Sequence, residues 1–225
     1  LLAGTRGLHL THPEAEVRRA TLRHLQELVR QCARLGGRVM VLGGGRHRRV
    51  LDGVTLSEAL DHAAETLRAL GDDLVARGVL LGIEPLAPGS DNLLNTAAAA
   101  AELVDRIGCP NIGLTLDARA MESEAAPRDA LVAAHAGRLV HVHVNDASGA
   151  GPGMGETDLR PMLDALKSVS YGGWISAEAF QAFPDPDTVA RRSLDYLRSA
   201  WAADARSRRS PRLNWRTPCT TTRQT

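Results

Sequence analysis

Residues 112–146 read IGLTLDARAMESEAAPRDALVAAHAGRLVHVHVND, and this stretch decides the fold class. Two short, mainly apolar runs, Ile112–Asp117 and Leu139–Asp146, flank a helical segment near Pro127–Ala136. Strands that are buried on both faces and alternate with helices are typical of a parallel sheet covered by helices. The stretch therefore predicts one strand–helix–strand unit of an α/β protein.

The same alternation extends in both directions along the chain. Further strands are expected at Arg38–Gly45, Val79–Leu86 and Trp174–Phe180, with a short remnant at Gly7–Leu10. The other expected helices are Glu14–Leu35, Leu56–Ala76, Thr96–Ile107, Leu159–Val169 and Asp187–Trp201. A complete (β/α)8 TIM barrel has eight strands in about 250 residues. Five clear strands therefore predict an α/β TIM barrel that is incomplete at its N-terminus, with the first βα unit or more missing.

The domain organisation follows from a change in composition near the C-terminus. Residues 1–203 would form the barrel domain, and residues 204–225 a separate basic tail. Residues 206–225 contain six arginines and no acidic residue, which is typical of a disordered segment. A nucleic-acid-binding tail is an alternative, but scattered arginines with a single tryptophan support it weakly. A translated frameshift would have the same composition.

The overall composition restricts the partners and the compartment. The 27 basic and 26 acidic side chains give a net charge of +1, so no global field attracts nucleic acid or an anionic membrane. The three cysteines form no C-x-x-C pair, which argues against a disulfide framework and a structural zinc cluster. The given sequence does not open with a charged n-region followed by an apolar h-region, and it contains no apolar run of about 20 residues. We expect a soluble, cytoplasmic protein with no nucleic-acid or membrane partner, and a homo-oligomer is compatible with these features.

Four successive strands each end with one side chain that could bind a metal ion. Alternate residues of a strand share a face, and this count places the following residues at the ends of the polar faces: Glu84, Asp117, His143 and Glu178. They are separated by 33, 26 and 35 residues, close to the roughly 30 residues of one βα repeat. An open doubly wound sheet has the same alternation of strands and helices. A barrel, however, places its functional residues at the carboxyl ends of several different strands, as seen here.

Three carboxylates brought together repel one another unless a cation lies between them. A site of three carboxylates and one imidazole favours Mn²⁺ or Mg²⁺, and Zn²⁺ or Co²⁺ are also compatible. Each residue also has a simpler interpretation, because Asp117 could cap the following turn and a strand histidine is often structural. Only the joint pattern predicts one divalent metal ion. His141 lies deeper on the same face, as a support for the ligands or as a substrate contact.

These residues and their surroundings resemble the sugar phosphate isomerase/epimerase family of xylose isomerase-like TIM barrels. The resemblance is carried by GIEPL (82–86), NLLNTAAAAAELV (92–104), LTLDARAMESE (114–124), HVHVNDASGAGPGMGETDL (141–159) and YGGWISAEAF (171–180). It implies that Glu84, Asp117, His143 and Glu178 bind the metal ion. It also implies that Glu84 and Glu178 are the acid/base pair of a proton transfer through an enediolate, with the metal ion as the electrophile.

The resemblance implies a small sugar, sugar phosphate or polyol ketone as the substrate, contacted by Arg48, Arg119 and His141. The segment GGGRHRRV (43–50) could hold a phosphate or sugar carboxylate, and a solvated basic loop is the alternative. Two positions depart from many sugar epimerases of the superfamily. Ala120 stands where they have a substrate-binding histidine, and residues 149–150 are Gly-Ala where they have an arginine. Arg119 is expected to take over part of this contact.

Three alternatives remain at this point. A dehydratase of a cyclic polyol ketone, similar to inosose dehydratase, would use the same metal ion and bases. An inactive truncated barrel would keep the residues without turnover, because an incomplete barrel leaves unpaired strand edges. A nuclease similar to the apurinic endonucleases needs extra ligands and a basic groove, and the near-neutral charge before the tail argues against it.

Overall fold

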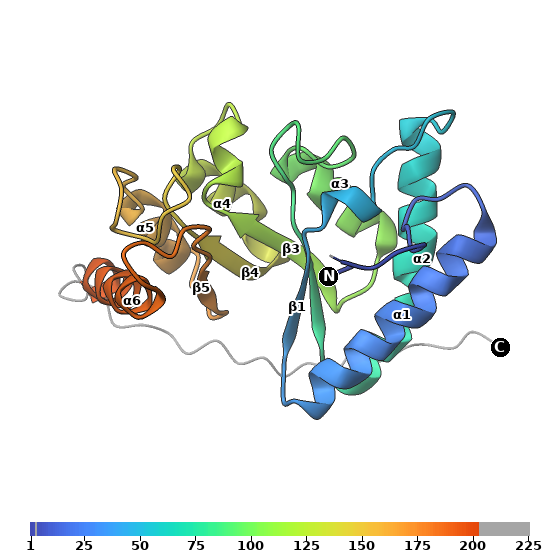
Figure 1. Cartoon of the computed structure of the whole chain (residues 1–225), viewed down its shortest axis with the longest axis horizontal. Helices are drawn as coiled ribbons and strands as arrows, with labels where there is room; N and C mark the ends of the chain where they lie inside the picture. The colour runs from blue at the N-terminus through green and yellow to red at the C-terminus, as the bar shows by residue number, and fades with distance from the viewer. Residues whose placement is uncertain (3, 203–225) are drawn as a thin grey trace.

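The computed structural model describes residues 1–2 and 4–202, and strands and helices alternate throughout this part (Figure 1). Five parallel strands form one sheet in the order of the chain. The strands are β1 (Val39–Leu42), β2 (Leu80–Ile83), β3 (Ile112–Asp117), β4 (Leu139–Val144) and β5 (Ile175–Ala177). The sheet is a TIM-barrel-like half-barrel, which confirms the expected α/β fold class.

Six α-helices alternate with the five strands, and consecutive helices pack on one another. The helices are α1 (Ala15–Arg34), α2 (Leu56–Arg77), α3 (Ala97–Ile107), α4 (Arg128–His135), α5 (Arg160–Ser168) and α6 (Pro186–Ala202). Short 3-10 turns occur at Gly45–His47, Ala120–Ser123 and Ala136–Arg138. In Figure 1, α1 and α2 flank β1 at one end of the sheet, and α5 and α6 lie beyond β5 at the other. Within the described residues, every helix is too short or too polar to cross a bilayer.

The expected elements agree with the structure except at their ends. Each of the five clear strands forms, but four of them are shorter than expected at one or both ends. The remnant expected at Gly7–Leu10 is wrong, since this segment is not a strand and Leu10 instead donates its N–H to the carbonyl of His47 at 2.7 Å. The tail expected at residues 204–225 lies outside the described residues.

One hydrophobic core lies between the sheet and the helices. Leu114 and Leu116 of β3 belong to it together with Leu67, Leu70 and Leu74 of α2. The other face of the sheet carries small and polar residues. A Cβ added at Gly82 would lie 2.0 Å from Thr115 Oγ1, so glycine is required for the two strands to approach on this face. The apolar packing thus leaves the polar face free to carry the site.

Helix α2 shows how local sequence fixes the ends of an element. Thr55 Oγ1 accepts a hydrogen bond from the Glu58 N–H at 3.2 Å, and the Glu58 carboxylate accepts from the Thr55 N–H at 2.8 Å. This reciprocal capping box satisfies two backbone donors that the helix itself cannot pair. Gly78 ends the helix at φ 61°, a left-handed conformation that favours glycine. The chain then enters β2 in a fixed direction.

We predict that Thr55→Ala lowers the free energy of unfolding by about 1 kcal/mol, because the cap hydrogen bond is lost. Urea unfolding followed by circular dichroism measures the change. The matched control is Ser57→Ala, an exposed position two residues further on, with an expected change below about 0.5 kcal/mol. Equal effects of the two substitutions would contradict the capping role.

Candidate metal centre

Strand register brings the four predicted ligands to one end of the sheet. Asp117 is the register partner of His143 in the β3–β4 pair. Glu84 and Glu178 each lie one residue beyond a strand and still continue the ladder. The Glu84 N–H donates to the carbonyl of Leu42 at 3.3 Å, and the Glu178 N–H donates to that of Val144 at 3.1 Å. All four side chains therefore start from the carboxyl ends of β2 to β5.

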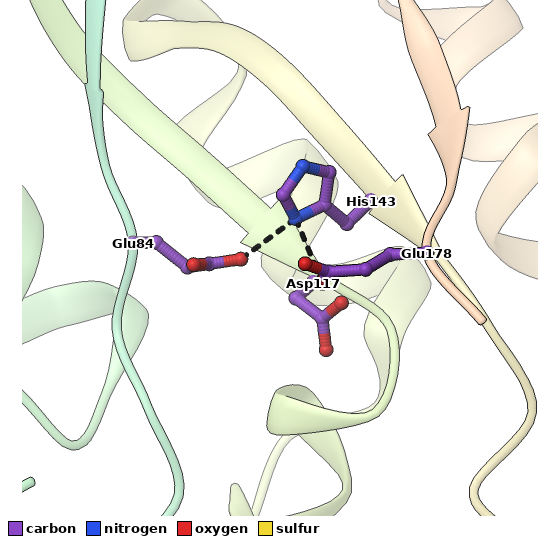
Figure 2. A group of neighbouring side chains, drawn as sticks. All are labelled: Glu84, Asp117, His143 and Glu178. Atoms are coloured by element: carbon purple, nitrogen blue, oxygen red, sulfur yellow. Dashed lines mark hydrogen bonds and ion pairs between the residues drawn. The ribbon is translucent and has the colours of Figure 1, made fainter. Parts of the chain in front are cut away.

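These four side chains converge on one point (Figure 2). Each offers one ligand atom, and the four atoms lie within 4.8 Å of one another. His143 Nδ1 lies 2.8 Å from Glu84 Oε1 and 3.2 Å from Glu178 Oε2. Glu84 and Asp117 are buried, whereas Glu178 is partly exposed. Within residues 1–2 and 4–202, this is the one group of three or more such residues that could hold a metal ion.

The electrostatics of the group show strong mutual influence. Burial disfavours the charged form of His143, but the hydrogen bonds and charges of Glu178 and Glu84 outweigh it and raise the His143 pKa from 6.5 to about 10. The bond to His143 in turn lowers the pKa of Glu178. Burial raises the pKa of Asp117, and the negative charges of Glu84 and Glu178 raise it further. Three carboxylates thus compete for one positive charge, which is the conflict that a divalent cation resolves.

Asp117 is both a turn cap and a member of the group. Its Oδ1 accepts from the Ala120 N–H at 2.7 Å, and its Oδ2 accepts from Asn145 Nδ2 at 2.8 Å. Asn145 is fully buried and its Oδ1 accepts from the Arg119 N–H at 2.9 Å. The alternative that Asp117 caps the following turn is therefore correct, and it coexists with a place in the cluster. The sequence prediction missed Asn145, although it continues the odd-numbered face of His141 and His143 in β4.

Glu84 is surrounded by the glycine-rich segment after β1. A Cβ added at Gly43 would lie 1.8 Å from Glu84 Oε2, so the carboxylate occupies the space that the glycine leaves. Arg48 is 1% exposed and donates to protein groups, namely the carboxylate of Asp91 and the carbonyls of Leu42 and Glu84. Its predicted contact with substrate stays a prediction. Arg46 and Arg49 are exposed, as in the alternative of a solvated basic loop.

A cavity of about 690 Å³ opens beside the cluster. Its lining residues are Gly43, Glu84, Leu86, Ala87, Pro88, Ser90, Asp117, Arg119, Ala120, Glu122, Ser123, Ala147, Glu178 and Phe180. The guanidinium of Arg119 stacks over the ring of Phe180 at 5.2 Å, and its Nε donates to the carbonyl of Ala147 at 3.2 Å. Arg119 therefore lines the cavity, and its predicted contact with substrate stays a prediction. The sequence prediction did not assign a role to Phe180.

His141 lies beneath the cluster rather than in the cavity lining. It is buried, its ring packs edge-on against that of His143 at 5.0 Å, and its Nδ1 has no hydrogen-bond partner. Burial lowers the pKa of His141 to about 4, and the charge of His143 adds to this effect. The imidazole of His141 is therefore neutral at pH 7 and packs against the ring of His143. Its predicted contact with substrate stays a prediction.

The donor set fits a hard divalent cation. Three carboxylates and one imidazole, from four successive strands, are the ligand types that Mn²⁺ and Mg²⁺ accept. Residues next to the cluster hold its members by hydrogen bonds, such as that from Asn145 to Asp117. Such supporting contacts orient metal ligands and increase affinity. The residues present therefore fit a metal ion.

Comparisons with known proteins agree with this arrangement. A family model described as xylose isomerase-like TIM barrel matches residues 1–200. The L-ribulose 3-epimerase of Mesorhizobium japonicum is 29% identical over 180 residues, which are 79% of this chain and 60% of that protein. The probable ketose 3-epimerase of Synechocystis is 26% identical and covers 87% of this chain and 74% of its own length. The chain thus spans 60 to 74% of the length of these two relatives.

Solved structures share the fold. A structure of L-ribulose 3-epimerase superposes with a TM-score of 0.80 at 21% identity, over 91% of this chain and 77% of that one. A D-psicose 3-epimerase crystallised in the presence of D-fructose superposes with a TM-score of 0.79 at 21% identity, over 88% of this chain and 76% of that one. At this identity the likeness concerns the fold. It indicates that the five strands occupy the positions of a larger barrel of the same kind.

The raised pKa of His143 predicts a pH dependence of stability in metal-free protein. A group with a pKa of 6.5 when unfolded and about 10 when folded stabilises fully below pH 6.5, and this stabilisation is lost as pH rises to 10. We expect the urea concentration at the unfolding midpoint, measured in the presence of a chelator, to decrease as the pH rises from 6.5 to 10. His143→Gln should flatten this part of the profile. Parallel profiles of the variant and the wild type would contradict the ion pairs with Glu84 and Glu178.

Proposed function

Because the chain belongs to the xylose isomerase-like TIM barrel family, we propose that it is a metal-dependent sugar epimerase or isomerase. The observation that carries this proposal is the convergence of Glu84, Asp117, His143 and Glu178 from four successive strands. The distant relatives are named as ketose epimerases, which supports a small ketose, sugar phosphate or polyol ketone as the substrate. The cavity of about 690 Å³ is large enough for such a molecule.

The proposed roles divide the cluster into two pairs. Asp117 and His143 would act as ligands, while Glu84 and Glu178 would act as ligands and as the acid/base pair. The two glutamates approach His143 Nδ1 from β2 and β5, on either side of the cluster (Figure 2). A carbon bound between them can lose its proton to one carboxylate and receive a proton from the other on the opposite face. This transfer through an enediolate inverts the stereocentre.

The metal ion would be Mn²⁺ or Mg²⁺ in the first instance, with Zn²⁺ or Co²⁺ also compatible with the donor set. When bound, a divalent cation polarises a substrate carbonyl and lowers the repulsion among the carboxylates. The remaining features belong to this chain. Burial of Glu84 and Asp117 limits water around the reacting carbon, and the stacked pair of Arg119 and Phe180 offers a polar and an apolar contact to the far end of a sugar.

We expect wild-type protein, after chelation and reloading with Mn²⁺, to bind about one ion per chain and to convert a ketose to its epimer. Both properties should be lost in Glu178→Gln and His143→Ala, because each removes a ligand. Metal content by mass spectrometry and turnover in D2O measure them, and deuterium in the product reports proton transfer. Glu102→Gln, an exposed carboxylate of α3, is the matched control and should behave as wild type.

Each contrary outcome has a definite meaning. A folded wild-type protein that retains none of Mn²⁺, Mg²⁺, Co²⁺ and Zn²⁺ would remove the proposed function from this chain. Metal binding with loss of water from the product would replace the epimerase by a dehydratase. Turnover without solvent deuterium would replace proton transfer by a hydride shift. Metal binding without any turnover would favour the inactive barrel.

A further inference from the structure

We propose that Arg48, paired with Asp91, is a positioning residue that sets the place of Glu84 for metal binding and proton transfer. The inference rests on the proposed function, since it concerns the same site. It gives the glycine-rich segment after β1 a role different from the phosphate cradle that its sequence suggests. The evidence lies in burial, in the direction of three hydrogen bonds and in the space around the Glu84 carboxylate.

Arg48 is the largest of the fully buried side chains in the described part of the molecule. Its guanidinium spans the ends of two adjacent strands. Nη1 donates to the carbonyl of Leu42 at 2.8 Å, and Nη2 donates to the carbonyl of Glu84 at 2.6 Å. The Leu42 carbonyl also accepts the N–H of Glu84. Arg48 thus donates to the carbonyl of Glu84 and also to the carbonyl of Leu42, which accepts the N–H of Glu84.

Asp91 fixes the guanidinium from the other side. Its Oδ2 accepts from Arg48 Nε at 2.7 Å, and both side chains are shielded from solvent. Its Oδ1 accepts from the N–H groups of Asn92 and Leu93. The ion pair therefore ties the segment after β1 to the loop between β2 and α3. That loop also supplies Leu86, Ala87, Pro88 and Ser90 to the cavity wall.

A buried ion pair is a costly way to stabilise a fold, because apolar residues of the same volume often serve equally well. This pair instead fixes the positions of the groups that it binds. A guanidinium is planar and presents several donors in a fixed fork, so it can hold two carbonyls and one carboxylate at set directions. The flexible ammonium of lysine cannot reproduce this fork. The pair therefore places the backbone of Glu84, which lies beyond the end of β2.

Gly43 provides the space for the side chain of Glu84. Arg48 fixes the backbone of Glu84, while the missing side chain at Gly43 leaves room for its carboxylate, which a Cβ would meet at 1.8 Å. Gly45 has a similar relation to the neighbouring loop, because a Cβ there would lie 2.2 Å from the carbonyl of Ser90. Gly43 and Arg48 of GGGRHR (43–48) thus both act on Glu84, one on its carboxylate and one on its backbone. No phosphate is needed to explain this composition.

The decisive experiment compares Arg48→Lys with Arg138→Lys. Arg138 forms a two-point ion pair with Asp105 on the surface, with bonds of 2.8 and 2.7 Å, so the control makes the same chemical change away from the site. We expect Arg48→Lys to weaken Mn²⁺ binding about 10- to 100-fold, as for other residues that orient metal ligands. The visible spectrum of bound Co²⁺ should also shift, because Glu84 changes its position. Far-UV circular dichroism should stay unchanged, and Arg138→Lys should match wild type.

Two further variants keep the test decisive if Arg48→Lys does not fold. Arg48→Met combined with Asp91→Leu leaves no unpaired buried charge, and it should fold yet bind Mn²⁺ more weakly. Gly43→Ala should displace the Glu84 carboxylate with a similar loss of affinity. Its control is Gly137→Ala, where an added Cβ meets nothing within 4 Å.

The outcomes separate this inference from the proposed function. If wild type binds Mn²⁺ and the folded Arg48 variants keep its affinity within twofold with an unchanged Co²⁺ spectrum, the positioning role is overturned while the proposed function stands. If folded wild type binds no metal ion, the proposed function fails and the inference fails with it. Weaker binding and a shifted spectrum in the Arg48 variants, with Arg138→Lys and Gly137→Ala unchanged, would establish the role.

Discussion

The repulsion among three carboxylates at the end of one sheet is the constraint on which the rest of the structure depends. Parallel register places Asp117 beside His143, and the ladder bonds of Glu84 and Glu178 keep both residues at the same edge. A fold that brings these charges together must then hold them there. Buried polar groups behind the cluster, among them Asn145 and Arg48, supply this restraint. The helices contribute by packing on the other face and leaving this face to the polar groups.

The sequence was sufficient for the fold class and for the members of the cluster. The reason is that the alternation of side chains along a strand and the length of the βα repeat can be read locally. They place four residues on one edge without any knowledge of packing, namely Glu84, Asp117, His143 and Glu178. Asn145 could have been found in the same way, because it shares the parity of His143. Its side chain was missed because the strand was expected to provide one ligand only.

The environment of Arg48 could not be read from the sequence in the same way. Its partners Asp91 and Glu84 lie 43 and 36 residues away, so their meeting depends on how two loops pack. A basic residue in a glycine-rich segment suggests an anion site, and only the burial of the side chain distinguishes a structural role. The expected remnant at Gly7–Leu10 failed for a related reason. An apolar run alone does not provide a neighbouring strand with which to pair.

The two glutamates of the site differ in how firmly the protein holds them. Glu84 follows β2, which is hydrogen-bonded on both sides, and its backbone is also bound by a buried guanidinium. Glu178 follows β5, a three-residue strand that pairs with β4 alone among the described residues. The protein therefore holds Glu84 more firmly than Glu178. Under the proposed function, Glu84 would keep a constant position, and substrates of differing shape would be accommodated on the side of Glu178.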